Sequence, residues 1–232
     1  MTAFFRFPHT PHLAWLGSGR PRNDKVLSPE ETRAMLSHEL VVEEKIDGAN
    51  LGFSVSADGT LRAQNRGTYL NLEAPTGQWK PLKRWLSVRR ETLGRELRPG
   101  LMLFGEWCYA VHSIHYSRLP DWFLVFDVYD HARGEFWDVH RRNEFAAVLG
   151  LAIVPERARG RLTIGSLTRL LDSSVLADGP AEGIYVRRED LGRVVARAKL
   201  VRPEFVQAIN VHWSKHHLET NRLATSADGA RS

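Results

Sequence analysis

One short stretch, Lys45-Ile46-Asp47-Gly48, constrains this chain more than any other part of its sequence. It directly follows Glu43 and Glu44 and an apolar run at 40–42, which is typical of the end of a buried strand. Such a stretch suits one kind of chemistry, in which the amine attacks a phosphorus, the carboxylate holds a sugar or a metal ion, and the glycine lets the backbone approach a ligand. Because roughly one chain in twenty of this length has the pattern by chance, its meaning depends on the other residues.

The composition predicts a folded protein with a basic surface. The chain has 232 residues, and its hydrophobic content of 43% is enough for a substantial core. The net charge of +5 makes a polyanionic partner plausible, although an arginine-rich solvated surface explains the charge equally well. Lysine is rare, with six residues among the 32 cations, so a lysine at the centre of the motif is notable.

Cysteine usage and the N-terminal sequence indicate the compartment. The single cysteine, Cys108, excludes a disulfide within the chain and a cysteine-based zinc site, as is typical of a reducing compartment. Residues 1–17 are aromatic but are interrupted by charged residues and prolines, which fits neither a signal peptide nor a membrane span. We therefore expect a cytoplasmic protein that is not bound to a membrane.

Hydrophobic periodicity and turn residues predict an α+β fold of antiparallel strands with helices packed on them. The first helix has clear start signals, with Ser28 as N-cap, Pro29 at the first helical position and Glu31 completing a capping box. The predicted helices cover residues 29–38, 79–93, 138–149, 163–171 and 203–218, and the predicted strands cover residues 40–43, 51–55, 61–65, 101–108, 122–129, 151–154, 182–188 and 193–201. We expect a single domain over 1–220 and a flexible tail over 221–232.

Two cations near the end of the last strand are candidate partners of Lys45. Arg197 and Lys199 lie two residues apart on a strand and therefore share a face. They could lower the pKa of Lys45 and hold a phosphate. A solvated cationic face is the alternative.

Three acids lie at the ends of predicted strands. Asp47, Glu106 and Glu182 offer hard carboxylate oxygens, which suit Mg²⁺ and ribose hydroxyls, and a surface turn would explain any one of them alone. Arg66 ends the strand paired with the one after Lys45, so it would bring a guanidinium to the same place. Phe126 offers an aromatic face for a base, with core packing as the alternative.

Taken together, these segments have a specific order: Lys-x-Asp-Gly, Asn-Arg-Gly, Gly-Glu, Phe-Asp, Glu-Gly and Arg-x-Lys. In this order the chain resembles the covalent nucleotidyltransferase superfamily, and within it the RNA ligase family related to bacteriophage RNA ligase 2. The resemblance covers roughly residues 40–200. It implies an antiparallel-sheet, ATP-grasp-like ligase domain. Only about thirty residues follow Lys199, so we expect no OB-fold domain of the kind found in DNA ligases and capping enzymes.

The resemblance also implies residue roles, with Lys45 forming a phosphoramidate with AMP taken from ATP. By the same resemblance, Glu44 would contact adenine, Glu106 would contact the ribose, and Phe126 would stack on the base. Asp47 and Asn50 would lie near the ribose and the reacting phosphate, and Arg66 would contact the nucleotide and a 5′-phosphate end. Glu182, together with Asp47, would bind a metal ion (Mg²⁺ or Mn²⁺), and Arg197 and Lys199 would hold the α-phosphate. The family more often has lysine at both of the last two positions, and a guanidinium at 197 is not equivalent to an ammonium.

The function that the resemblance implies is ATP-dependent sealing of 5′-phosphate and 3′-hydroxyl RNA ends, in RNA repair. We expect a monomer. The alternatives are a non-ligating module that binds nucleotides or RNA, and a ligase acting on DNA or hybrid nicks. RNA ends would contact exposed arginines, for which the candidates are Arg84, Arg89, Arg90, Arg141, Arg142, Arg157, Arg159 and Arg161.

The histidines carry a weaker signal. His212 and His216 lie four residues apart on a predicted helix beside His217, which would allow a metal site, but no third ligand is evident and surface histidines are favoured. His112 and His115 are expected in a loop near the nucleotide.

Overall fold

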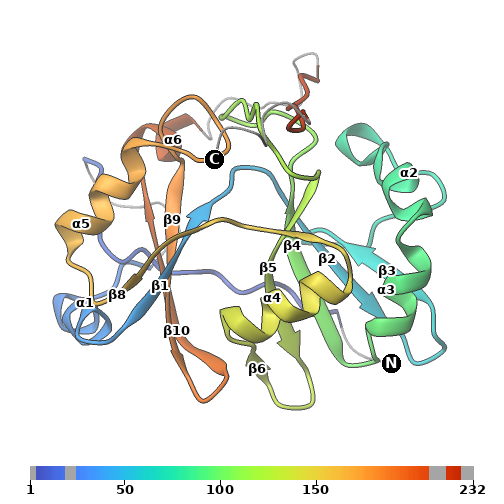
Figure 1. The fold of residues 1–232 in the computed structure, drawn as a ribbon, viewed down its shortest axis with the longest axis horizontal. Coiled ribbons are helices and arrows are strands. Elements are labelled where there is room, and N and C mark those ends of the chain that lie inside the picture. The colour runs from blue at the N-terminus through green and yellow to red at the C-terminus, as the bar shows by residue number, and fades with distance from the viewer. Residues whose placement is uncertain (1–3, 19–24, 209–217, 226–232) are drawn as a thin grey trace.

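The computed structural model describes residues 4–18, 25–208 and 218–225, and in them two sheets lie side by side (Figure 1). The first sheet has the order β10-β9-β1-β8, where the strands are β1 (Leu40–Lys45), β8 (Glu156–Gly160), β9 (Gly183–Asp190) and β10 (Arg193–Val201). The second has the order β3-β2-β4-β5-β6, with β7 beside β5, where the strands are β2 (Ala49–Val55), β3 (Leu61–Gln64), β4 (Leu101–Trp107), β5 (Phe123–Asp130), β6 (Glu135–Phe136) and β7 (Ala152–Ile153). Every pairing between these strands is antiparallel except that of β5 with β7, which confirms the α+β prediction.

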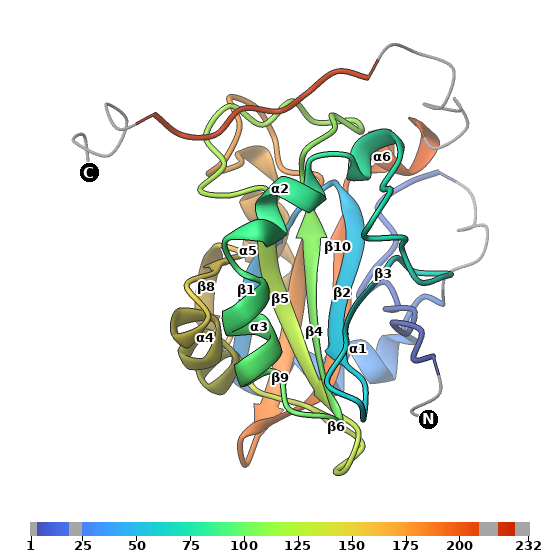
Figure 2. The same ribbon diagram turned by 90° about the vertical axis from the view of Figure 1, so that its right-hand side faces the viewer.

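Helices cover the outer side of each sheet. Helices α1 (Pro29–Leu36) and α5 (Ile164–Arg169), the latter continued by the 3₁₀ turn η2 (Leu170–Asp172), pack on the first sheet. Helices α2 (Leu82–Ser87) and α3 (Arg90–Glu96) lie across the second sheet (Figure 2), close to the 3₁₀ turn η1 (Gly77–Trp79). The remaining helices are α4 (Val139–Val148) and α6 (Pro203–Ala208).

The opposite face of the second sheet carries its own apolar cluster. Phe104, Leu124 and Phe126 pack there with Ile46, which follows β1, and with Phe7 from the N-terminal segment. This cluster joins the residues after Lys45 to the second sheet, so burial of apolar surface holds the end of β1 in place.

The capping box at the start of α1 forms as predicted. Ser28 Oγ accepts a hydrogen bond from the Glu31 amide at 3.1 Å, and a Glu31 carboxylate oxygen accepts one from the Ser28 amide at 2.7 Å. These bonds satisfy amides that the helix itself cannot.

Three features differ from the expected elements. The helix predicted over 79–93 is divided into η1, α2 and α3, with a break at Val88 and Arg89. The strands β6 and β8 were not predicted at all, because β6 is only two residues long and β8 alternates charged with small residues and so lacks an apolar pattern.

The C-terminal segment also packs more closely than expected. Asn221, where we expected the tail to begin, is 3% exposed and accepts a hydrogen bond from the Tyr116 amide at 2.7 Å. Its side-chain amide donates to the carbonyl oxygens of Cys108 and Ala110. The packed chain therefore continues past this boundary. No described helix has the length and apolar character needed to cross a bilayer.

Candidate active site

The last residue of β1 is Lys45, and its amine lies between the two oxygens of one carboxylate. Lys45 Nζ is 2.7 Å from Glu182 Oε1 and 2.6 Å from Glu182 Oε2. The pairing of β1 with β9 sets Lys45 opposite Gly183, so it also brings Glu182 to the amine. Burial alone would lower the pKa of Lys45, but Glu182, Tyr185 and Glu106 outweigh it and raise the pKa above its usual value.

A second carboxylate, Glu106, completes an acidic pair around the lysine. It lies on β4 opposite Asn50 of β2. Burial raises the pKa of Glu106 to about 8, against the attraction of Lys45 and with added repulsion from Glu182. In the protein without a ligand, Glu106 is therefore largely protonated at neutral pH.

These groups line a cavity of about 670 Å³. Eight of the ten residues chosen from the sequence contribute to its wall, namely Glu44, Lys45, Asn50, Arg66, Glu106, Phe126, Glu182 and Lys199. They come from both sheets and from segments more than a hundred residues apart, which the fold brings together. Asn50 Oδ1 is buried and has no hydrogen-bond partner in the described protein.

Glu44 is in the wall, but its carboxylate is occupied by the protein. The side chain is fully buried and accepts hydrogen bonds from Arg157 Nη1 at 2.9 Å, from the Val175 amide at 3.0 Å and from Ser174 Oγ. These donors compensate the buried charge.

Asp47 is not among the residues lining the cavity. Its Oδ2 accepts hydrogen bonds from the amides of Ser113 and Ile114 at 2.6 and 3.1 Å, and its own amide donates to the Tyr116 hydroxyl at 2.8 Å. In this structure Asp47 therefore holds the loop after β4, rather than facing the cavity as we expected for a metal or ribose contact.

Arg197 also departs from the expectation. Its Nη1 lies 3.0 Å from Asp127 Oδ2, and its guanidinium packs over the rings of Phe7 and Phe136 at 4.7 and 4.1 Å. It does not line the cavity, whereas Lys199 does. Burial lowers the pKa of Arg197, although Asp127 opposes the effect.

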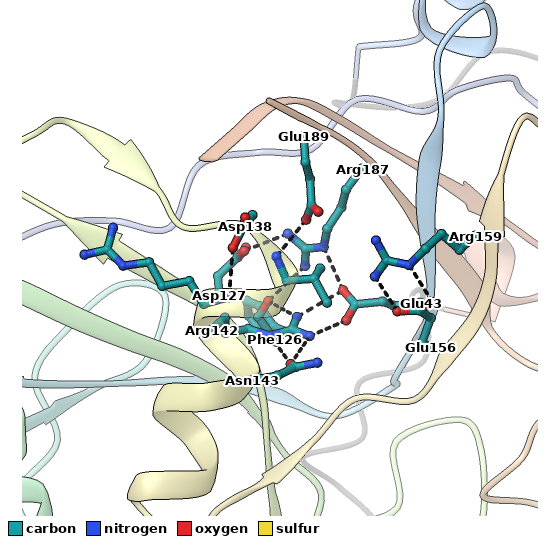
Figure 3. Close-up of polar contacts among 12 residues, drawn as sticks. Glu43, Phe126, Asp127, Asp138, Arg142, Asn143, Glu156, Arg159, Arg187 and Glu189 are labelled. Atoms are coloured by element: carbon teal, nitrogen blue, oxygen red, sulfur yellow. Dashed lines mark hydrogen bonds and ion pairs between the residues drawn. The ribbon is translucent and has the colours of Figure 1, made fainter. Parts of the chain in front are cut away.

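A buried ion network that we did not predict reaches the cavity wall, which Glu43 and Arg187 help to line. Arg142 and Arg187 converge on Glu43, and Arg187 also reaches Asp127 (Figure 3). The distances are 2.5 Å from Arg142 Nη2 to Glu43 Oε1, 2.7 Å from Arg187 Nε to Glu43 Oε2, and 2.6 Å from Arg187 Nη1 to Asp127 Oδ1. Both guanidiniums donate to the Phe126 carbonyl oxygen, at 2.7 and 3.0 Å. No sequence pattern indicates this network, since its members are far apart in the chain.

Gly48 lines the cavity and also has a packing role that we did not expect. A Cβ atom built at this position would lie 2.7 Å from the Trp107 carbonyl oxygen, which is closer than real Cβ contacts. The close approach is to the neighbouring strand β4, so the glycine lets the turn after Lys45 pack against β4.

The expected arginine surface is only partly present. Arg142 is 1% exposed and belongs to the buried network, and Arg157 binds Glu44, so neither can contact RNA in this state. Arg89 binds Asp121 at 2.8 Å, and Arg141 packs over the Trp137 ring at 3.8 Å. Of the other candidates, Arg84, Arg90, Arg159 and Arg161 are exposed.

Several histidines contribute to the cavity wall, and of these only His112 was expected near the nucleotide. His9, Thr10 and His12 of the N-terminal segment line the cavity, and the segment is held there because the Leu13 amide donates to the Lys199 carbonyl oxygen at 2.7 Å. His112 lines it as well, whereas His115 is an exposed loop residue. His212, His216 and His217 lie outside the described residues. Among those that are described, no group of three or more His, Cys, Asp or Glu residues is arranged to hold a metal ion.

Comparison with known proteins identifies the family. A family model described as RNA ligase matches residues 38–201, and the chain therefore belongs to the RNA ligase family. A search of curated proteins returned no match.

Solved structures share the fold at low sequence identity. A mutant of Naegleria gruberi RNA ligase with ATP and Mn aligns with a TM-score of 0.66 and 19% identity, covering 89% of this chain and 59% of that one. Another mutant of this ligase, with AMP and Mn, aligns with a TM-score of 0.61 and 16% identity, covering 89% of this chain and 59% of that one. The same ligase with PPi aligns with a TM-score of 0.58 and 18% identity, covering 88% of this chain and 60% of that one. The chain thus spans less than two thirds of these proteins.

Proposed function

We propose that this protein is an ATP-dependent RNA ligase that works through a lysyl-AMP intermediate. The observation that carries the proposal is the Lys45 amine, which lines a cavity of about 670 Å³ and contacts Glu182, with Glu106 in the same cavity wall. Membership of the RNA ligase family and similarity of fold to a ligase solved with ATP, AMP and PPi support it.

In the first step, the amine of Lys45 loses a proton and attacks the α-phosphorus of ATP. A nitrogen–phosphorus bond forms and the bond to pyrophosphate breaks. Lys199 neutralises charge on the α-phosphate. Phe126 offers a ring for the adenine, and Glu106 contacts the ribose. The AMP then passes to a 5′-phosphate RNA end, and a 3′-hydroxyl displaces it, which seals the strand.

The residues present fit a divalent metal ion that arrives with the nucleotide. Mg²⁺ is commonly held by one or two carboxylates together with substrate phosphates, and Glu182 offers such a carboxylate. When bound, Mg²⁺ or Mn²⁺ would neutralise charge on the phosphate oxygens. Asp47 remains part of this set by resemblance only, because its carboxylate is turned toward Ser113 and Ile114.

Labelling with [α-³²P]ATP and Mg²⁺ tests the first step. Wild type should take up one acid-labile, alkali-stable label that maps to Lys45, and Lys45→Ala should take up none. Lys83→Ala, which changes an exposed lysine, is the matched control. If wild type takes up no label, or if Lys45→Ala takes up as much as wild type, the proposal is wrong, and a non-ligating nucleotide-binding module becomes the better reading.

A panel of 5′-phosphorylated nicked RNA, nicked DNA, hybrid duplexes and single strands tests the substrate class. The proposal expects joining of RNA ends in preference to DNA ends. Joining of DNA nicks alone would favour the alternative of a DNA or hybrid ligase.

Residues 1–220 are proposed to form one adenylation domain that acts as a monomer. The support is that a single cavity is lined from the N-terminal segment, both sheets and α6. Light scattering and limited proteolysis test this, since a dimer, or a stable fragment lacking the N-terminal segment, would contradict it.

A further inference from the structure

One wall of the cavity is built from residues to which neither the motifs nor the proposed mechanism gives a role. It consists of Gln78 and Trp79 from η1 and of His112 from the loop after β4, and Arg66 lines the same cavity. The wall is distinct from Phe126, which comes from β5 and is the ring we assign to adenine.

The turn η1 is fixed to the second sheet through Trp107. This side chain is completely buried, and its Nε1 donates to the Gln78 carbonyl oxygen at 2.9 Å. The Trp79 ring lies nearly parallel to the Trp107 ring, with 6.4 Å between the centroids and 24° between the planes. Trp79 therefore presents a half-buried indole to the cavity in a fixed orientation.

The Gln78 side chain is built for polar recognition. It is 6% exposed, and its Oε1 lies 3.1 Å from His112 Nε2. The amide nitrogen has no hydrogen-bond partner in the described part of the chain, and it is not among the side-chain atoms sealed off from solvent. Whichever way the amide is turned, one polar end contacts His112 and the other is left for a ligand in the cavity.

Phe126 and Trp79 are two of the aromatic side chains in the cavity wall, and the proposed mechanism uses only Phe126. We propose that the Gln78–Trp79 wall binds the terminal ribonucleotide of the RNA end, with its base stacked on Trp79 and its ribose hydroxyl bonded to Gln78. This inference rests on the proposed function. Aromatic side chains stack on bases with little sequence preference, and the 2′-hydroxyl distinguishes RNA from DNA. Arg66 adds positive charge for the adjoining phosphate.

The closing experiment separates this subsite from the adenylation centre. Full-length wild type, Trp79→Ala, Trp79→Phe and the control Lys83→Ala are compared in two assays, protein adenylation with ATP and sealing of chemically 5′-adenylated RNA. We expect Trp79→Ala to raise the KM for an RNA strand by about tenfold, roughly the loss of one stacked base. The KM for ATP should change by less than about twofold, and Trp79→Phe should restore most of the loss.

Two arms show which end is bound. In one arm the concentration of the 3′-hydroxyl strand is varied while that of the 5′-adenylated strand is fixed. In the other arm the 5′-adenylated strand is varied and the 3′-hydroxyl strand is fixed. A higher KM in either arm supports the proposal and names the end. A change in neither arm, or an equal change in the KM for ATP, which would mean that adenine stacks on Trp79, overturns it. Absence of adenylation in wild type would instead refute the proposed function.

A second variant keeps the inference testable should Trp79→Ala melt at a much lower temperature. Gln78→Met retains Trp79 and removes the polar group. The ratio of sealing rates between strands with a ribose and with a deoxyribose at the terminal position should fall by about fivefold, as expected for the loss of one hydrogen bond. An unchanged ratio would contradict the role of Gln78.

Discussion

The pair formed by Lys45 and Glu182 sets the state of the nucleophile before a nucleotide binds. The two side chains are 20% and 13% exposed, so their mutual attraction is only weakly screened. A lysine whose pKa is raised in the folded protein adds stability at all pH values below its unfolded pKa, and loses that contribution only as the pH rises through the higher folded value. The amine is thus held as ammonium until ligands change its surroundings.

We therefore predict that Glu182→Gln lowers the pKa of Lys45, because the carboxylate that stabilises the ammonium is removed and the burial remains. NMR titration of side-chain-labelled lysine in the ligand-free protein measures this, with the Lys45 signal assigned from Lys45→Arg. In wild type the Lys45 signal should titrate above the ordinary lysine pKa of about 10.4. A wild-type Lys45 signal that titrates at or below this ordinary value would show that the pair does not hold the charge.

Glu106 gives a prediction with the same direction of pH dependence, but in a lower pH window. Its pKa of about 8 in the folded protein lies above the ordinary value of 4.5, so between these values the folded state binds a proton that the unfolded state has released. The free energy of unfolding should therefore fall as the pH rises through this window, by up to ~1.4 kcal/mol per unit from this residue.

Glu106→Gln should flatten that slope, since glutamine cannot titrate. Urea denaturation at pH 5, 6, 7 and 8 measures it, and Glu91→Gln, at a side chain that is 95% exposed, is the control and should retain the wild-type slope. Identical slopes for wild type and Glu106→Gln would place the pKa of Glu106 near its ordinary value.

At the scale of elements, strands with an apolar pattern could be predicted from the sequence, whereas a strand made mostly of charged and small residues could not. The capping box, the apolar strands β4 and β5, and the turn at Leu191 and Gly192 all have local signatures, and the structure contains them. The residues of β8 show no apolar alternation, because its side chains are matched to residues in other segments rather than to its own neighbours. Arg157 on this strand faces the buried Glu44, while Arg159 is exposed and binds only Glu156.

This contrast within one strand can be tested. Arg157→Ala removes a guanidinium from a fully buried carboxylate and should destabilise the protein by ~3 kcal/mol. Arg159→Ala breaks an exposed pair and should cost less than ~1 kcal/mol. Chemical denaturation of both variants gives the comparison. Equal losses would show that Ser174 and Val175 alone are sufficient for Glu44.

At the scale of the whole molecule, the buried network joins the two sheets. Glu43 and Arg187 belong to the first sheet, while Asp127 and the Phe126 carbonyl belong to the second, and Arg142 reaches both from α4 (Figure 3). The motif residues identified from the sequence lie on both sides of this junction. The ion pairs at this junction could not be predicted from local pattern, because their members are far apart in the chain.

Removing Arg142 should test how strongly the junction holds. Arg142→Met leaves Glu43 with Arg187 as its remaining cation and deprives the Phe126 carbonyl of one donor, so we expect a loss of ~3–5 kcal/mol in the free energy of unfolding. Arg141→Met, one residue earlier, loses only a cation–π contact with Trp137, worth about 0.5–1 kcal/mol, and serves as the matched control.

A double-mutant cycle then separates the ion pair from simple loss of packing. Glu43→Gln should also destabilise the protein, because it leaves the two arginines with one buried carboxylate fewer. If the pair is the source of the effect, the double variant should be more stable than the sum of the single losses implies, with a coupling of at least ~1 kcal/mol. Additive losses would mean that Arg142 acts by filling space, and the two sheets would then be joined mainly by the apolar cluster of Phe7, Phe104 and Phe126.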